Sequence, residues 1–124
     1  MRAPGVEGPE AGRITLRPAT KAVKRALREL AAAAHEEALR RALLPVATAF
    51  DDWMKGKLGS GELTERIHEF HQGPARELYV RYNSGPLEFA VAHAIIAGLI
   101  DRTRVPAEVI KHCRAEIDFL MSAP

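Results

Sequence analysis

From about residue 18 onward, apolar residues recur three and four positions apart, which is the spacing of one face of an α-helix. The first helix is predicted to open at Pro18 and Thr20. Pro45 has no amide hydrogen, so it should kink this helix or divide it in two. The apolar stripe of this segment consists of Val23, Leu27, Leu30, Ala34, Leu39, Leu43, Val46, Phe50 and Trp53.

Glycine and proline mark the breaks that follow. Gly59-Ser60-Gly61 predicts a turn, in which Ser60 caps a helix that ends at Gly73. Pro74 suits the first turn of a short successor, with Gly73-Pro74 as a hinge. Trp53 precedes the first turn, so we expect it to be a buried core anchor.

The last third of the chain is the most apolar. Between residues 87 and 100 the only ionisable side chains are Glu88 and His93, which favours a buried helix. Pro106 begins the last helix, with Cys113 as a small buried hydrophobe. No stretch alternates as a strand does, so the predicted fold class is all-α. We expect a single-domain bundle of five or six helices with a long, Pro45-kinked first helix, made of a flexible Gly/Pro-rich tail (residues 1–12) and a helical domain (residues 13–124).

Composition narrows the class of protein. A chain of 124 residues fits one domain, and 47% hydrophobic with 27% charged residues is typical of a globular protein. The single cysteine excludes an internal disulfide and fits a reducing compartment. The start of the chain lacks the apolar core of a signal peptide, and no apolar run spans a bilayer. We therefore expect a soluble, cytoplasmic protein without membrane partners.

The segment 68–83 holds two of the five histidines, two arginines and both tyrosines. Arg76 follows Pro74 in a predicted first helical turn, where free backbone amides favour an anion. An arginine there binds a carboxylate or phosphate with two hydrogen bonds. The same residues also fit a purely structural role, with arginine paired to Glu69 or Glu77. The predicted ligand- or partner-binding site comprises His68, His71, Arg76, Glu77, Tyr79 and Tyr82.

Metal binding is the alternative for the same segment. Glu65 and His68 have the Glu-x-x-His spacing of di-iron bundles, but those proteins need that motif twice, and here it occurs once. His68 and His71 share a helical face as well, a weak signal for a zinc or nickel site. We expect no metal and no cofactor. His35 and His112 stand among charged residues and are expected to face solvent.

A second feature is basic. No acidic residue lies between Glu10 and Glu29, and the dipole of the first helix disfavours cations at its start. Helix stability therefore does not explain these residues. They form either a solvated face or a surface for the phosphates of a nucleic acid. The basic face comprises Arg17, Lys21, Lys24, Arg25 and Arg28.

Residues 23–43 are rich in alanine, whose small side chain lets a second helix approach closely. A helix this long should outrun its shorter neighbours, so we expect a two-fold homodimer through this face, which Ala34→Glu should weaken.

A spaced set of residues from Trp53 onward carries a resemblance. It comprises Trp53 and Gly56, Gly61-Glu62-Leu63, Ile67-His68, the run from Gly73 to Tyr79, and Tyr82-Asn83. This pattern resembles an uncharacterised family of small bacterial all-helical proteins. The resemblance implies a bacterial, cytosolic, helical protein in which His68, Arg76, Glu77 and Tyr79 are the site residues.

The leading hypothesis for function is a non-enzymatic helical interaction or regulatory module, such as an antitoxin-like partner, acting as a homodimer with a protein partner. No nucleophile, paired carboxylates or glycine-rich phosphate loop favours an enzyme. A small metal-assisted or hydrolytic enzyme centred on His68, His71 and Arg76 is the first alternative. A nucleic-acid-associated protein using the basic face within residues 13–28 is the second.

Overall fold

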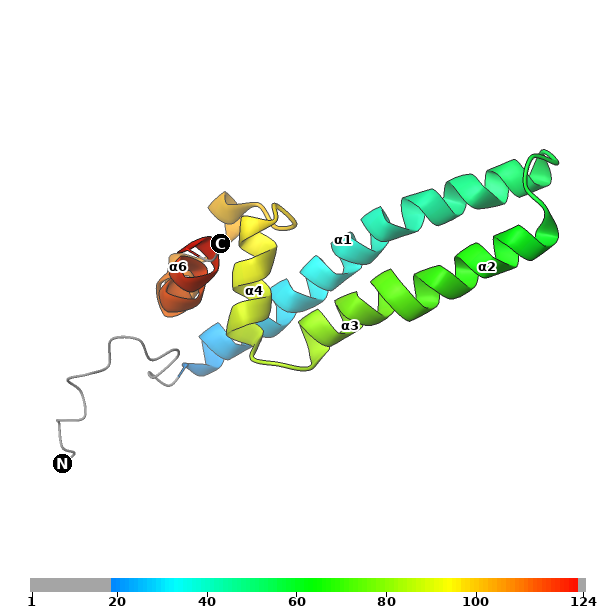
Figure 1. Ribbon diagram of the computed structural model, residues 1–124. Coiled ribbons are helices and arrows are strands. Elements are labelled where there is room, and N and C mark those ends of the chain that lie inside the picture. Colours follow the sequence, from blue (N-terminus) through cyan, green and yellow to red (C-terminus); the bar gives the residue numbers. More distant parts are fainter. Residues whose placement is uncertain (1–18, 123–124) are drawn as a thin grey trace, which may run out of the picture. The chain divides into compact units, whose positions relative to one another are not determined.

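The computed structural model describes residues 19–122, and this part of the chain is all-α, with no strand (Figure 1). The predicted fold class is therefore confirmed. The predicted tail, residues 1–12, lies outside the described residues. In order, the elements are α1 (Lys21–Met54), α2 (Ser60–Phe70), a π-helical turn η2 (His71–Ala75), α3 (Arg76–Asn83), α4 (Leu87–Ile96), a 3-10 turn η3 (Arg102–Arg104), α5 (Ala107–His112) and α6 (Arg114–Ser122).

The helix α1 begins where the sequence places it. The Thr20 hydroxyl accepts a hydrogen bond from the Val23 amide at 3.1 Å, which satisfies one of the free donors of the first turn. Pro45 lies inside the helix without dividing it, so the expected division is wrong. A proline removes one backbone hydrogen bond, and the other bonds of this 34-residue helix continue on both sides. The kink itself stays a prediction.

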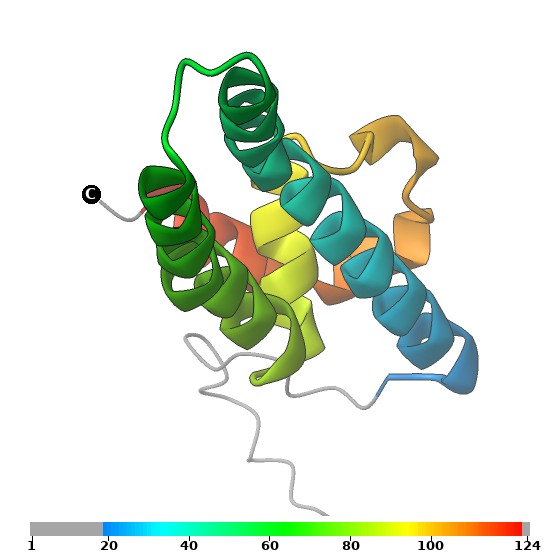
Figure 2. The ribbon, with the colours of Figure 1, turned by 90° about the vertical axis from the view of Figure 1, so that its right-hand side faces the viewer.

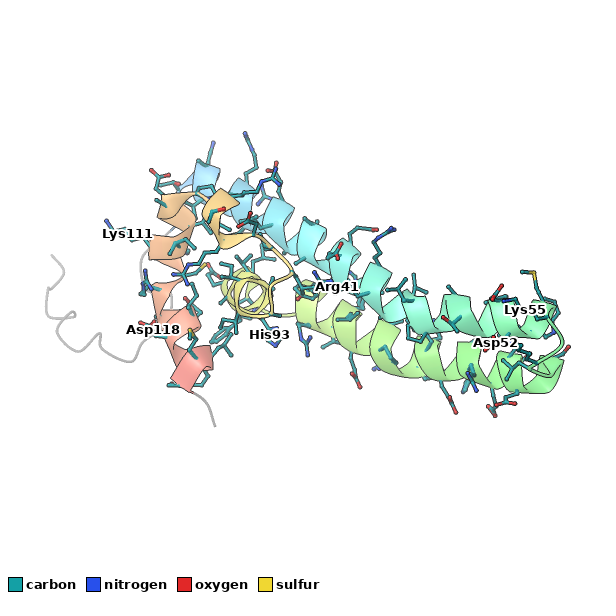
Figure 3. All side chains as sticks on the ribbon, turned by 90° about the horizontal axis from the view of Figure 1, so that it is seen from above. Arg41, Asp52, Lys55, His93, Lys111 and Asp118 are labelled. Carbon is teal, nitrogen blue, oxygen red and sulfur yellow. The ribbon has the colours of Figure 1, made fainter. Side chains whose placement is uncertain are left out.

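Where the sequence predicted one helical domain, contacts within the chain define two compact units, each containing part of α1. Of the described residues, the first unit combines residues 19–31 with residues 86–122. Within it α4 packs on α6, and the core is formed by Leu27, Val91, Val109, Cys113 and Ile117. The prediction that Cys113 is buried is confirmed. Figure 3 shows Lys111 on α5 and Asp118 on α6, both with exposed side chains.

His112 does not face solvent as expected. Its Nε2 lies 3.0 Å from a carboxylate oxygen of Glu88, and both side chains are mostly buried. The sequence neighbours of His112 are charged, but Glu88 is brought to it from α4, twenty-four positions earlier in the chain.

The second unit, residues 32–85, is a helical hairpin. The later part of α1 and the continuous rod of α2, η2 and α3 run antiparallel and side by side (Figures 1 and 2). Near the connecting turn, the Trp53 indole Nε1 donates to the Ser60 hydroxyl at 2.9 Å. Far from that turn, the Asn83 amide nitrogen lies 3.3 Å from His35 Nδ1. Lys55 and Asp52 mark the turn end in Figure 3.

Two local predictions in the hairpin are wrong. Ser60 is not a cap, because Gly59 precedes the first residue of α2 without a side-chain bond, and the Ser60 hydroxyl accepts from Trp53 instead. Gly73-Pro74 is not a hinge that ends a helix. The backbone stays helical through both residues and widens into the π-turn η2. Pro74 has no amide to complete an α-helical bond, and a π-turn is one way to continue past it.

The alanine-rich face is not available for a second copy. Ala31, Ala34 and Ala38 are buried within the chain itself, with Ala34 at 0% exposure. The expectation that these alanines form the dimer interface is therefore wrong. The close approach that small side chains allow is already used within the protomer.

No helix in residues 19–122 is both long and apolar enough to cross a membrane.

Candidate functional site

The hairpin contains a cavity of about 450 Å³ between its two antiparallel helical segments. We call it the His35 cavity. It is formed by α1 on one side and by η2 and α3 on the other. Its lining residues are His35, Leu39, His71, Gln72, Ala75, Arg76 and Tyr79.

The structure brings together half of the predicted anion site. His71, Arg76 and Tyr79 line the His35 cavity. His68 and Glu77 are exposed and are not among its lining residues, so their part in a binding site stays a prediction. The sequence predicted a hinge at Gly73-Pro74, whereas the backbone of α2, η2 and α3 is one continuous rod, and these two side chains lie outside the cavity.

Tyr82 joins the site indirectly. It is 4% exposed, and its ring stacks on His35 with centroids 5.8 Å apart. Burial raises the pKa of the Tyr82 phenol, and the neighbouring Arg81 guanidinium offsets part of this effect. The hydroxyl oxygen is buried, and no hydrogen bond of ordinary geometry reaches it within the described residues. Tyr82 therefore supports the His35 ring.

His35 is the site residue that sequence reasoning missed, since it was expected to face solvent. Its ring lies between two tyrosines, stacked on Tyr82 and edge-on to Tyr79 at 6.4 Å. The available signal was helical spacing, because His35 precedes Leu39 by one turn on the apolar side of α1. Charged neighbours in sequence point to other faces of the helix and say little about this one.

The lining of the His35 cavity is rich in basic side chains. Among the described residues it includes two histidines and an arginine and no carboxylate. Arg76 is exposed, and within residues 19–122 no ion pair joins it to Glu69 or Glu77, the partners that a structural role would give it. Its charge is therefore available to a ligand.

Metal coordination finds no support in the arrangement of the described residues. Among them, no three histidine, cysteine, aspartate or glutamate side chains converge on a point that could hold a metal ion. His68 and Glu65 both lie exposed on α2, and His71 is near the His35 cavity without an acidic companion in its lining.

A second surface of the hairpin is apolar. Along α1 its residues are separated by four, three, four and three positions, and we call them the apolar seam: Leu39, Leu43, Val46, Phe50 and Trp53. Leu43, Phe50 and Trp53 are 44%, 42% and 40% exposed. Ile67 on α2 is 41% exposed.

Trp53 is thus not the buried core anchor that its position predicted. Its ring meets Phe50 edge-on at a centroid distance of 6.5 Å, and its indole nitrogen bonds Ser60. A two-layer hairpin has no third element within it to cover these rings, so both stay partly in solvent.

The basic face is exposed where the structure describes it. Lys21, Lys24, Arg25 and Arg28 all lie on the solvent side of α1. Arg17, the fifth residue, lies outside the described residues.

Comparison of the chain with protein-family models, with curated proteins and with solved structures finds no match. The resemblance to a family of small bacterial helical proteins therefore stays a prediction.

Proposed function

We propose that this protein is a non-enzymatic helical interaction module that acts as a homodimer, with the apolar seam as its interface. The observation that carries the proposal is the seam itself. Three of its five side chains are large, apolar and at least 40% exposed, although the sequence pattern marks them as helix-packing residues.

The seam has the spacing of a helix-packing surface. Alternating steps of four and three are the a and d positions of a heptad repeat, which point at a neighbouring helix. The hairpin leaves them beside its own interface, which buries mainly the small side chains of Ala34, Ala38 and Ala49. A second hairpin laid against the seam would complete a four-helix bundle, the usual way to bury such a stripe.

The charges of the hairpin are compatible with pairing two identical copies. On α1, Glu37 pairs with Arg41 at 2.8 Å and Asp51 with Lys55 at 2.8 Å. With about 100° between successive residues, these pairs lie on the opposite side of α1 from the seam. Two identical seams related by a two-fold axis would therefore meet without bringing these charged pairs of the two copies together.

A dimeric bundle of this kind leaves the rest of each protomer free to contact a regulatory partner. The polar side of α2, which carries the Arg66–Glu62 pair, would remain exposed. The test is the mass in solution. Light scattering coupled to gel filtration should give twice the mass of one chain at micromolar concentration. A single species of one-chain mass up to millimolar concentration would remove the proposal.

A further inference from the structure

We propose that the His35 cavity binds a small organic anion, a carboxylate or phosphate group carried on an apolar body. This site shares Leu39 with the apolar seam but does not depend on dimerisation, since all its lining residues come from one chain. The argument rests on the tautomer of one histidine, on the charge of the lining and on the size of the cavity.

Asn83 determines which nitrogen of His35 carries the proton. The Asn83 amide nitrogen donates to the Tyr79 backbone carbonyl at 3.0 Å, which fixes the orientation of the amide. The same nitrogen lies 3.3 Å from His35 Nδ1. Because an amide nitrogen only donates, Nδ1 must accept, and a neutral imidazole then holds its proton on Nε2.

That Nε2–H donor has no acceptor among the described residues. The atom is buried, and no group in residues 19–122 bonds to it. A buried donor without an acceptor costs free energy, and native proteins seldom leave one in that state. An oxygen atom of a ligand would supply the missing acceptor.

The rest of the lining specifies the charge of that ligand. Arg76 contributes a permanent positive charge with planar donors that match a carboxylate or phosphate. His71 and Gln72 add further hydrogen-bonding groups, and within residues 19–122 no acidic side chain lines the cavity to repel an anion. An anion is therefore the ligand that these groups favour.

The size and walls of the cavity specify the body of the ligand. At about 450 Å³ it falls within the range of small-molecule sites, roughly 300–1,000 Å³, and is far larger than a bare ion needs. Leu39 and Ala75 supply apolar wall. Tyr79 is 61% exposed and stands edge-on to His35, and we expect its ring to move aside when a ligand oxygen reaches Nε2.

The test uses the full chain and four probes: benzoate, phenyl phosphate, inorganic phosphate and benzyl alcohol. Titrations followed by NMR should show benzoate or phenyl phosphate shifting the amide signals of residues 71–79 and the His35 ring nitrogens, with Nε2 protonated before addition. Whichever of the two binds more tightly identifies the anionic group. Benzyl alcohol, the neutral match, should bind at least tenfold more weakly than the better anion.

Variants separate a built site from general charge attraction. Arg76→Gln should weaken binding of the anion about tenfold or more, and Arg76→Lys should restore only part of it. Arg66→Gln removes another exposed arginine, which lies outside the cavity and pairs with Glu62, and should leave binding unchanged. Leu43→Glu, which disrupts the seam, should also leave it unchanged, so failure of the dimer and failure of the site are distinguishable.

Three results would overturn the proposal. The first is no response to either organic anion at millimolar concentration. The second is a sign of nonspecific charge attraction. This would be seen if Arg76→Gln and Arg66→Gln weakened binding of the organic anion equally, or if inorganic phosphate alone bound, with no preference for residues 71–79. The third is a free protein in which His35 carries its proton on Nδ1.

Discussion

Two neighbouring leucines of α1 provide a sharp test of the homodimer. Leu43 belongs to the apolar seam, and Leu44 is turned about 100° farther round the helix, toward the side of the Glu37–Arg41 pair. Both are exposed, at 44% and 62%. We predict that Leu43→Glu converts the dimer to monomers and that Leu44→Glu does not.

The magnitude follows from the exposed fraction of Leu43. Full burial of a leucine side chain contributes about 1.5–3 kcal/mol, so burial of its exposed 44% contributes about 1 kcal/mol. The substitution occurs in both copies, which gives about 2 kcal/mol and raises the dimer dissociation constant on the order of thirtyfold. Burying two carboxylates adds to this loss.

Sedimentation equilibrium of both variants over a range of concentrations measures that constant. Thermal melts followed by circular dichroism provide the control, because exposed substitutions of this kind change protomer stability by only about 0.5 kcal/mol and glutamate suits a helix nearly as well as leucine does. Equal dissociation constants for the two variants would refute the assignment of the seam. A stronger effect of Leu44→Glu would move the interface to the opposite side of α1.

Three further predictions concern the core and the turn. Burial, together with the nearby Glu116 and Glu88, raises the pKa of the Cys113 thiol from 9.0 to about 12. Iodoacetamide at pH 8 should therefore leave this thiol unmodified in the folded protein, as judged by mass spectrometry. Rapid alkylation would show that the thiol is accessible. Since the folded state favours the protonated thiol, its contribution to stability is full below pH 9 and is lost as the pH rises toward 12; urea unfolding should show this loss, and Cys113→Ala should reduce it. Leu27→Ala should lower the free energy of unfolding by about 2–5 kcal/mol, because the leucine side chain is 2% exposed. Trp53→Ala should lower it by well under the roughly 3–5 kcal/mol lost with a buried aromatic side chain. Chemical denaturation of the two variants under identical conditions checks this order.

The sequence predicts most of the helical structure, because helix formation depends on local spacing. The start of α1 at Thr20, the absence of strands in the described residues and the burial of Cys113 all follow from neighbours within a few positions. Proline and glycine were less reliable guides. Pro45 and Pro74 both lie inside continuous helical backbone, since the loss of one hydrogen bond is small against the packing of a long helix.

The candidate site was predicted in part for a different reason. His71, Arg76 and Tyr79 are close in sequence, so helical spacing alone grouped them. His35 comes from α1, and its contacts with Tyr82 and Asn83 join residues about fifty positions apart. Trp53 shows the same limit of local pattern with the opposite error, since it was predicted to be buried and is exposed. Its size predicted burial, but whether anything covers it depends on the layers of the fold, which local pattern does not specify.

The π-turn at His71–Ala75 keeps the buried side chains of α2 and α3 on the same face of the helix. Leu63 on α2 and Tyr82 on α3 are both buried, yet they are nineteen residues apart (82 minus 63), and a regular α-helix would turn them about 100° from each other. One residue absorbed by the wider turn reduces the effective separation to eighteen, which is about five whole turns, and returns both side chains to the same face. Deleting Gln72 would leave a regular helix in which the two side chains are eighteen residues apart and still on the same face. A regular α-helix of unchanged length would instead turn Tyr82 about 100° out of the hairpin interface, so the wider turn is what lets this helix hold one extra residue while its two halves stay in one register.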